Sequence, residues 1–310
     1  METEPSEPAG DGQGGGDSSG EAPVRTQWQL FRRRFFHHKL AVFSLVFLVV
    51  LIVLCFSASW VAPHARDWTN DEIAAAPPSV GNWLGTDSGG HDILSNLLHG
   101  GQNSLKIGLA VALFSTLIGT AVGAIAGWYG KLVDATLMRI TDLFLVIPQL
   151  AVLAIGLKYL TEKDKGASPT SMIIVLVAIF WMSIARVVRA QMLSLREKEF
   201  VEAAKASGAS PVRIIVRHVL PNCLGPIMVA ATLAVAYAVL TEAAAAFLGF
   251  GFTYPTTSWG TMISDSKTSM GNPDQWYNVV FPGMMLFLTV LAVNFIGDGL
   301  RDALDPTSTE

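Results

Sequence analysis

The stretch "EFVEAAKASGASPVRIIVRHVLP", residues 199–221, is a polar and basic island between two long runs that carry no charge. Within it, small side chains recur at the three- and four-residue spacing of one helix face. The members of this narrow stripe are Phe200, Ala203, Ala204 and Ser207. The pattern predicts a short helix with one closely packable side.

The same stretch contains the signals that end one helix and start the next. Gly208 stands where a residue of left-handed conformation would close the first helix. Ser210 and Pro211 then supply an N-cap and a first-turn proline. The second helix would bury one apolar side, made of Ile214, Ile215 and either His218 or Val219, and Pro221 is expected to end it. We therefore expect a helical hairpin over residues 194–221.

The rest of the chain has too little charge for a water-soluble surface. Charged residues make up 15% of the sequence, against about 25% in soluble domains. A membrane-crossing helix needs about 20 apolar residues, and six uncharged runs approach or exceed this length if the ammonium group of Lys158 reaches the interface. The sequence predicts an all-α integral membrane protein with spans at about 40–62, 106–129, 142–160, 169–189, 224–248 and 277–298.

The charge distribution predicts the topology and the domain limits. Six acidic residues and few apolar ones occupy the first 21 positions, so residues 1–28 are expected to form a disordered tail. The membrane domain would cover 29–306, followed by a short tail at 307–310. With the N-terminus inside, 15 of the 21 Lys and Arg residues lie on the inner side. Both termini and the hairpin are therefore expected in the cytoplasm, with the first span acting as an uncleaved signal-anchor.

Several local features have more than one interpretation. Gly119, Gly123 and Gly127 form a small-xxx-small pattern, which serves either packing within this chain or a contact with another subunit. Pro148 should kink the helix of the third span or locally open it. Glu242 either lines a substrate path, makes a hydrogen bond between helices, or lies at the outer headgroups.

The outer loop before the second span predicts a short helix at 92–99. Asp87 or Ser88 would cap this helix, and Gly100-Gly101 would end it. Asp87, Asp92, His91 and His99 lie near each other in the sequence, but we interpret them as ordinary polar groups and expect no metal site.

Motifs for catalysis are absent from the sequence. It has no G-x-x-x-x-G-K-[ST] phosphate loop, no G-x-S-x-G elbow and no H-E-x-x-H pair. No residue is predicted to be catalytic, and ATP binding by this chain is not expected. The hairpin could lie on lipid headgroups or insert into a groove on a soluble partner.

The hairpin resembles the cytoplasmic EAA loop of ATP-binding-cassette (ABC) importer permeases. The resemblance lies in Glu202-Ala203-Ala204, Gly208 and Leu220-Pro221, although His218 stands where the usual pattern has isoleucine. Segments over about 29–306 also resemble, in order, the C-type permease of the dipeptide/oligopeptide/nickel family. They include "LGTDSGGHDILSNLLHGGQNSLKIGL", "RITDLFLVIPQL", "AAAAFLGFGFTYPTTSWGTMISD" and "NFIGDGLRDALDP".

This resemblance implies a type I ABC importer fold in a bacterial plasma (inner) membrane. The implied partners are a second homologous permease, two cytoplasmic ATP-binding subunits or one fused ATPase, an extracytoplasmic substrate-binding protein and the lipid bilayer, with no nucleic acid. ATP and Mg would be bound by the ATPase partners and no cofactor by this chain. The residues implied to couple to the ATPase are Glu202, Ala203, Ala204, Ser207, Gly208 and Pro221.

Peptides are the expected substrates, with nickel or another small solute as the alternative cargo. A stand-alone six-span secondary transporter or channel is the rival class, and a membrane protease is a third. A secondary transporter would be expected to carry ionisable groups in several spans, whereas Glu242 is the one candidate in this sequence. Co-purification with ATPase subunits would separate the first two classes.

Overall fold

The computed structural model describes residues 27–161, 167–269 and 272–304, and within these ranges it contains helices and turns but no named strand. The predicted tails at 1–28 and 307–310 lie outside the described residues, apart from positions 27 and 28. The α-helices are α1 Gln27–His37, α2 Lys39–Phe56, α3 Ala58–Val61, α4 Ile93–Tyr129, α5 Lys131–Val146, α6 Gln149–Leu160, α7 Pro169–Leu195, α8 Glu199–Ala206, α9 Pro211–Ile214, α10 Leu220–Ala245, α11 Trp259–Asp265 and α12 Tyr277–Leu304. Short 3₁₀ turns lie at Asp71–Ile73, Ser266–Ser269 and Pro273–Gln275, and π-helical turns lie at Ile215–Val219 and Ala246–Phe250.

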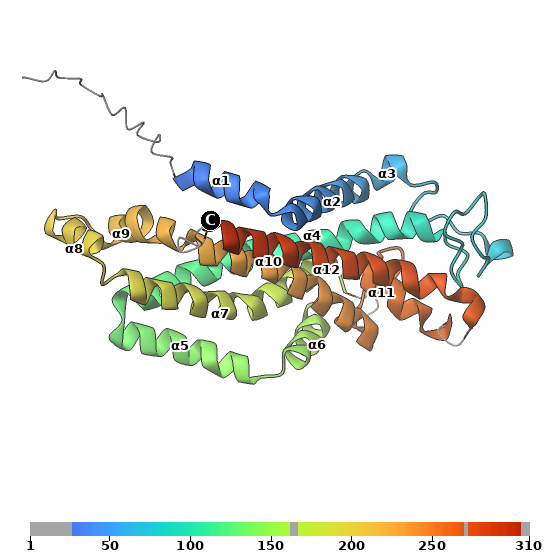
Figure 1. The fold of residues 1–310 in the computed structure, drawn as a ribbon. Helices are drawn as coiled ribbons and strands as arrows, with labels where there is room; N and C mark the ends of the chain where they lie inside the picture. Colours follow the sequence, from blue (N-terminus) through green and yellow to red (C-terminus); the bar gives the residue numbers. More distant parts are fainter. Residues whose placement is uncertain (1–26, 162–166, 270–271, 305–310) are drawn as a thin grey trace, which may run out of the picture.

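The long helices run side by side along one axis of an elongated bundle (Figure 1). Helix α4 packs most extensively on α7, α10 packs on both, and α12 joins α10 to α2. At one end of the bundle α8 lies beyond the ends of the long helices, with α9 next to it, and at the opposite end lie α3, α11 and the loop that precedes α4 (Figure 1). We call these the hairpin end and the loop end.

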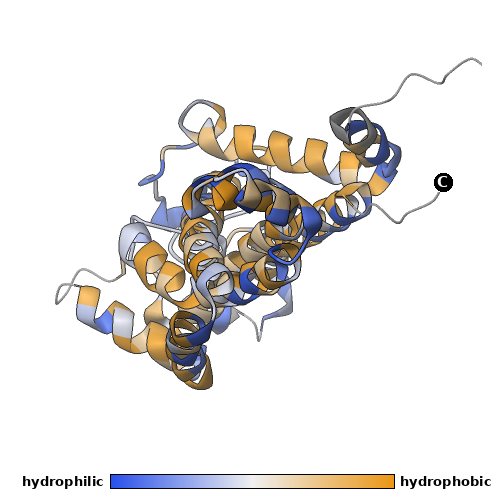
Figure 2. Ribbon diagram, turned by 90° about the vertical axis from the view of Figure 1, so that its left-hand side faces the viewer, coloured by the Kyte–Doolittle hydropathy of each residue, from blue (hydrophilic) through white to orange (hydrophobic). Residues whose placement is uncertain are grey.

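Within the described ranges, five helical segments are long and apolar enough to cross a membrane, and the bent pair α5–α6 would make a sixth span. Figure 2 shows that hydrophobic residues dominate the long helices, and many of their large apolar side chains are exposed, among them Phe43, Leu113 and Phe287. In α2, for example, 22% of the residues are buried within the chain. The rest of that surface has the character of a surface for lipid or for another subunit. The prediction of an all-α protein with apolar spans is confirmed.

The glycine pattern in α4 serves packing within the chain. A Cβ atom on Gly119 would lie 2.8 Å from Cβ of Ile184, and one on Gly123 would lie 2.8 Å from Cβ of Val188. Both neighbours belong to α7, so the glycines allow the two helix backbones to approach closely. Of the two interpretations of this pattern, the structure shows the one within the chain.

The third predicted span is interrupted at Ile147–Pro148 and consists of two helices, α5 and α6. Helices α5 and α6 meet at an angle of 89°, because Pro148 disfavours a helical conformation in the residue before it. Ile147 is accordingly extended, with φ −75° and ψ 132°. Helix α5 is tied to α7 by two ion pairs between the helices, Asp142 with Arg186 and Asp134 with Arg189.

The expectation of a short helix ending at Gly100-Gly101 is wrong. Asp92, not Asp87 or Ser88, caps the helix by accepting from the Ser95 amide at 2.8 Å. The helix then continues through both glycines because they provide space rather than a turn. A Cβ on Gly101 would lie 2.6 Å from the Cys55 sulfur and 2.7 Å from the Trp259 ring.

Candidate functional site

The projecting hairpin consists of α8, a tight reversal and α9 (Figure 1). Helix α8 begins after Lys198 and has Glu199 and Glu202 in its first turn and Lys205 in its last. This placement of charge suits the helix dipole, which favours acids at the N-terminus and bases at the C-terminus. The local sequence therefore supports a helix of only eight residues.

Gly208 closes α8 in a Schellman motif. Its backbone has φ +77°, and its amide donates to the carbonyl of Lys205 at 2.9 Å. The next amide, that of Ala209, donates to the carbonyl of Ala204 at 3.1 Å. These two bonds define the motif, and Ala204 and Ala209 provide the apolar contact that usually accompanies it. Glycine is favoured here by backbone conformation alone, because a Cβ on Gly208 would meet no atom within 4 Å.

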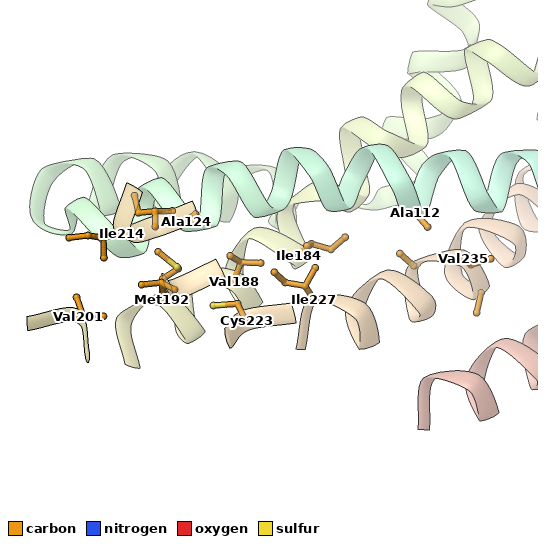
Figure 3. Packing of buried hydrophobic residues seen from close by; sticks show 14 of the residues in the cluster. Ala112, Ala124, Ile184, Val188, Met192, Val201, Ile214, Cys223, Ile227 and Val235 are labelled. Atoms are coloured by element: carbon orange, nitrogen blue, oxygen red, sulfur yellow. The ribbon is translucent and has the colours of Figure 1, made fainter. Parts of the chain in front are cut away.

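Val201 anchors the hairpin to the bundle. Its side chain is fully buried in an apolar cluster with Met192 of α7 and Ile214 of α9, part of which Figure 3 shows. Lys205, one turn further along the same side of α8, adds a contact, with its ammonium 5.5 Å from the centre of the Trp128 ring. The hairpin is thus a fixed projection with its own packing.

The predicted coupling residues fall into an exposed set and a half-buried one. Glu202, Ala203, Ser207 and Gly208 are exposed, whereas Ala204 is half-buried against the apolar cluster. Because small residues on an exposed helix leave the backbone accessible, a partner could approach this face closely. Sequence reasoning missed Val201, although its three-residue spacing from Ala204 is the signal that could have identified the inner face.

The expectation that Pro221 ends the second helix is wrong. The chain continues through it as one apolar helical segment, Pro211–Phe250. A proline inside a helix removes one hydrogen bond and crowds the preceding turn. Here the π-helical turn Ile215–Val219 comes directly before Pro221, and such turns take up local disruption in a helix. Pro221 is exposed at the start of α10, which follows the hairpin in the chain.

Glu242 lies far from the hairpin, in the loop-end half of α10. It is fully buried, and its Oε1 accepts from the hydroxyl of Ser258 at 2.6 Å. Ser258 also caps α11, so the carboxyl group joins α10 to the start of α11. Of the three interpretations, the hydrogen bond between helices describes this geometry. A role in lining a substrate path stays a prediction.

The acidic and histidine residues of the outer loop are separate polar contacts. His91 pairs with Asp87 at 3.0 Å, and His99 is buried within α4. In the described part of the chain, no three His, Cys, Asp or Glu residues are grouped so that they could hold a metal ion.

Comparison with protein families identifies the chain. The family model described as "Binding-protein-dependent transport system inner membrane component" matches residues 119–309. A second model, "N-terminal TM domain of oligopeptide transport permease C", matches residues 26–78. The chain therefore belongs to the family of inner-membrane components of binding-protein-dependent transport systems.

Curated relatives agree with this assignment. The chain is 41% identical to the oligopeptide transport system permease protein OppC of Mycobacterium tuberculosis, over 89% of this chain and 93% of that protein. It is 39% identical to the protein of the same name from Haemophilus influenzae, over 91% and 89%. It is also 38% identical to the dipeptide transport system permease protein DppC of Alkalihalophilus pseudofirmus, over 90% of each. The predicted resemblance to a C-type permease is confirmed.

The fold also matches a solved transporter. A chain of the MetNI methionine ABC transporter in an inward-facing conformation superposes with a TM-score of 0.55 at 22% identity, over 68% of this chain and 96% of that chain. At this identity the match supports the fold alone, and the predicted ABC importer fold is confirmed.

Proposed function

We propose that this chain is a permease subunit of an ATP-driven importer of peptides and that the hairpin α8–α9 is where a cytoplasmic ATPase engages it. One observation carries the proposal: the first helix of the hairpin, α8, lies beyond the ends of the long helices (Figure 1), while the inner face of the hairpin is packed into the core. A projection that is rigidly connected to the bundle can transmit a displacement, whereas a loosely attached loop cannot.

The chemistry of the hairpin suits a protein groove better than lipid headgroups. The exposed surface of α8 carries both acidic and small residues, among them Glu202, Ala203, Ser207 and Gly208, beside the basic Lys205 and the exposed ring of Phe200. A helix that lies on a membrane surface is typically basic on its polar face and has large apolar side chains on the other. In α8 the apolar Val201 is used for packing within the chain. Glu202 is proposed to pair with a basic group in the groove.

The remaining parts of the machine are proposed to belong to other subunits. A second homologous permease would complete the membrane core, and two ATP-binding subunits, or one fused ATPase, would hold ATP and Mg. This chain is proposed to have no enzymatic activity of its own. The inner-side excess of Lys and Arg supports cytoplasmic termini and a cytoplasmic hairpin, which places the loop end outside, facing a substrate-binding protein.

Peptides are proposed as the cargo because the relatives named above are oligopeptide and dipeptide permeases. Uptake by the reconstituted complex with its substrate-binding protein tests this. Dipeptides and oligopeptides are expected to be accumulated in an ATP-dependent manner and nickel is not. Accumulation of nickel without peptides would replace the peptide assignment and leave the permease assignment intact.

Site-directed crosslinking tests the coupling role. Cysteine at Ser207, which is exposed at the hairpin tip, is expected to crosslink to an ATP-binding subunit in the assembled complex. The matched control is cysteine at Val80, which is 96% exposed at the loop end and should give no such product. A complex that contains no ATPase, or a product from Val80 and none from Ser207, would refute the proposed role of the hairpin.

A further inference from the structure

The loop end contains a polar cavity of about 220 Å³ that the proposed coupling role does not use. Three segments that are distant in the sequence form its walls. They are the loop and start of α4 at residues 87–96, the loop at 252–257 together with α11, and the start of α12. The cavity is thus a feature of the folded bundle rather than of one loop.

One wall carries a fixed carboxylate and two rings. Oδ1 of Asp87 accepts from the amides of Gly89 and His91, each at 2.9 Å, and its carboxylate contacts the His91 ring nitrogen at 3.0 Å. The His91 ring packs against the Tyr254 ring with centroids 4.7 Å apart. Because each group is held by another, this wall is pre-organised.

A second carboxylate, Asp265 at the end of α11, faces the same cavity. Within the described residues, no Lys or Arg forms an ion pair with it inside 4 Å. The nearby Lys267 is directed elsewhere, to the carbonyl and the ring of Phe247. The side chain keeps contact with solvent, yet desolvation by its surroundings and the charge of Asp87 raise the pKa of its carboxyl. Two carboxylates share the cavity, and Asp265 has no direct cationic partner.

Asn278 provides an independent sign of a ligand. It lines the cavity and is 3% exposed, but neither its side-chain oxygen nor its nitrogen has a hydrogen-bond partner. A buried polar group without a partner costs about 1–3 kcal/mol. The contrast with Asp92 is informative, because Asp92 is equally buried at this end and both its oxygens are bonded, to Asn82 and Ser95.

The size of the cavity limits the ligand. Pockets that enclose whole small molecules measure about 300–1,000 Å³, so 220 Å³ suits one long side chain better than a peptide. A guanidinium group matches the wall because it forms charge-assisted bonds with carboxylates and stacks on aromatic rings. Lys supplies the charge without the planar fork.

We propose that this acidic pocket receives one basic side chain, arginine fitting best, from the extracytoplasmic substrate-binding protein. The guanidinium bonds to Asp265 and to the Asn278 oxygen and lies against the exposed side of Tyr254. This inference rests on the proposed function for the existence and the side of that partner. It adds the chemistry by which the partner docks.

Binding of the purified substrate-binding protein to the complete permease–ATPase complex in lipid nanodiscs tests the proposal. Asp265→Asn is expected to weaken binding by about ten- to a hundredfold, the range for a lost charged hydrogen bond. Asp274→Asn is the matched control: it removes the same charge from an exposed residue at the same end that does not line the cavity, and it should change affinity less than twofold. Ethylguanidinium chloride should compete with the binding protein more strongly than sodium chloride at equal ionic strength.

The outcomes separate this inference from the proposed function. If the wild-type complex fails to bind any substrate-binding protein, the proposed function itself fails. If wild type binds and Asp265→Asn binds equally well, only the docking pocket is wrong. If the variant keeps its affinity for the binding protein but loses uptake of arginine-containing peptides, the pocket belongs to the substrate path and the docking proposal is overturned.

Discussion

The two ends of the bundle are built in opposite ways. The hairpin end comes from one continuous stretch, 198–219, in which a left-handed glycine, an N-cap serine and a first-turn proline follow one another along the chain. The pocket at the loop end brings together Asp87, Tyr254, Asp265 and Asn278, which span most of the sequence. The hairpin depends on local backbone geometry, whereas the pocket depends on how α4, α11 and α12 pack.

The difference predicts which changes affect one end and which affect both. The helices α4 and α7 connect the ends and share the most extensive contact in the described chain. A change at their interface should disturb both ends together. Changes within the hairpin should spare the loop end, and changes in the pocket should spare the hairpin.

The largest effect is expected for Gly123→Leu. A Cβ at this position would lie 2.8 Å from Cβ of Val188 and 3.0 Å from the backbone nitrogen of Arg189, so the helices must separate. Overpacking of this kind typically costs about 1–3 kcal/mol, occasionally more. The apparent melting temperature should fall, and both ATPase coupling and docking of the binding protein should be reduced. Gly283→Leu is the control, because a Cβ there meets nothing within 4 Å.

Next in size is Gly208→Val, which should damage the hairpin end alone. A positive φ costs a residue with a side chain about 1–2 kcal/mol, and a β-branched residue tolerates it least. We expect transport-coupled ATP hydrolysis to fall at least tenfold while membrane insertion and binding-protein docking remain. Gly208→Asn should keep most activity, since asparagine accepts this conformation. Normal coupled hydrolysis in Gly208→Val would contradict the assignment of the hairpin.

Val201→Ala should loosen the hairpin without changing its outline. Removing two methyl groups from a fully buried site costs about 2 kcal/mol at about 0.8 kcal/mol per group, plus a term for the cavity left behind. Proteolysis and hydrogen exchange of residues 199–214 should increase, and coupling should weaken several-fold. Val212→Ala removes the same atoms from a side chain that is 65% exposed, and it should leave both measurements unchanged.

The sequence predicted the features that depend on neighbours in the chain. Gly208, Ser210 and Pro211 signal their conformations through local rules, so the hairpin could be described before its structure was known. Two local rules gave wrong boundaries: the π-helical turn Ile215–Val219 lets the helix continue through Pro221, and tertiary packing overrode the expected stop at Gly100-Gly101. The helix passes through Gly100-Gly101 to admit Trp259 and Cys55.

The pocket had no comparable signal in the sequence. Asp265 and Asn278 look like ordinary polar residues at the ends of helices, and only the fold shows that they share a cavity with Asp87. The one hint was that Asn278 lies within the uncharged run 275–297. Val201 was missed for the related reason that an inner face becomes visible only when its packing partners, such as Met192 and Ile214, are placed.

Asn278→Leu should affect stability and docking at the loop end in opposite directions. The replacement keeps the branched arrangement of side-chain heavy atoms and removes a buried carboxamide that has no partner, so the stability of the permease should rise slightly, by up to about 1 kcal/mol. Docking of the substrate-binding protein should weaken several-fold at the same time. A purely structural role for Asn278 would lower stability instead. Thermal unfolding and nanodisc binding, measured on one preparation, distinguish the two.

The smallest effect is expected from pH. Because the pKa of Asp265 is raised by desolvation first and by Asp87 second, its charge is lost at a higher pH than the usual value of about 3.9. Binding of a basic side chain should therefore weaken as the pH falls toward that range, and Asp265→Asn should flatten this part of the curve. Asp87, His91 and Lys267, the other titratable groups beside the pocket, are the same in wild type and variant, so the difference between the two pH curves isolates Asp265. The raised pKa acts in the opposite direction on the stability of the fold. The folded state holds the Asp265 proton more tightly than the unfolded state does, so the stabilisation that comes from the protonated carboxyl is lost as the pH rises through the raised pKa. Asp265→Asn should consequently be slightly more stable than wild type at neutral pH, while Asp274→Asn, in which an exposed carboxylate changes, should show neither effect.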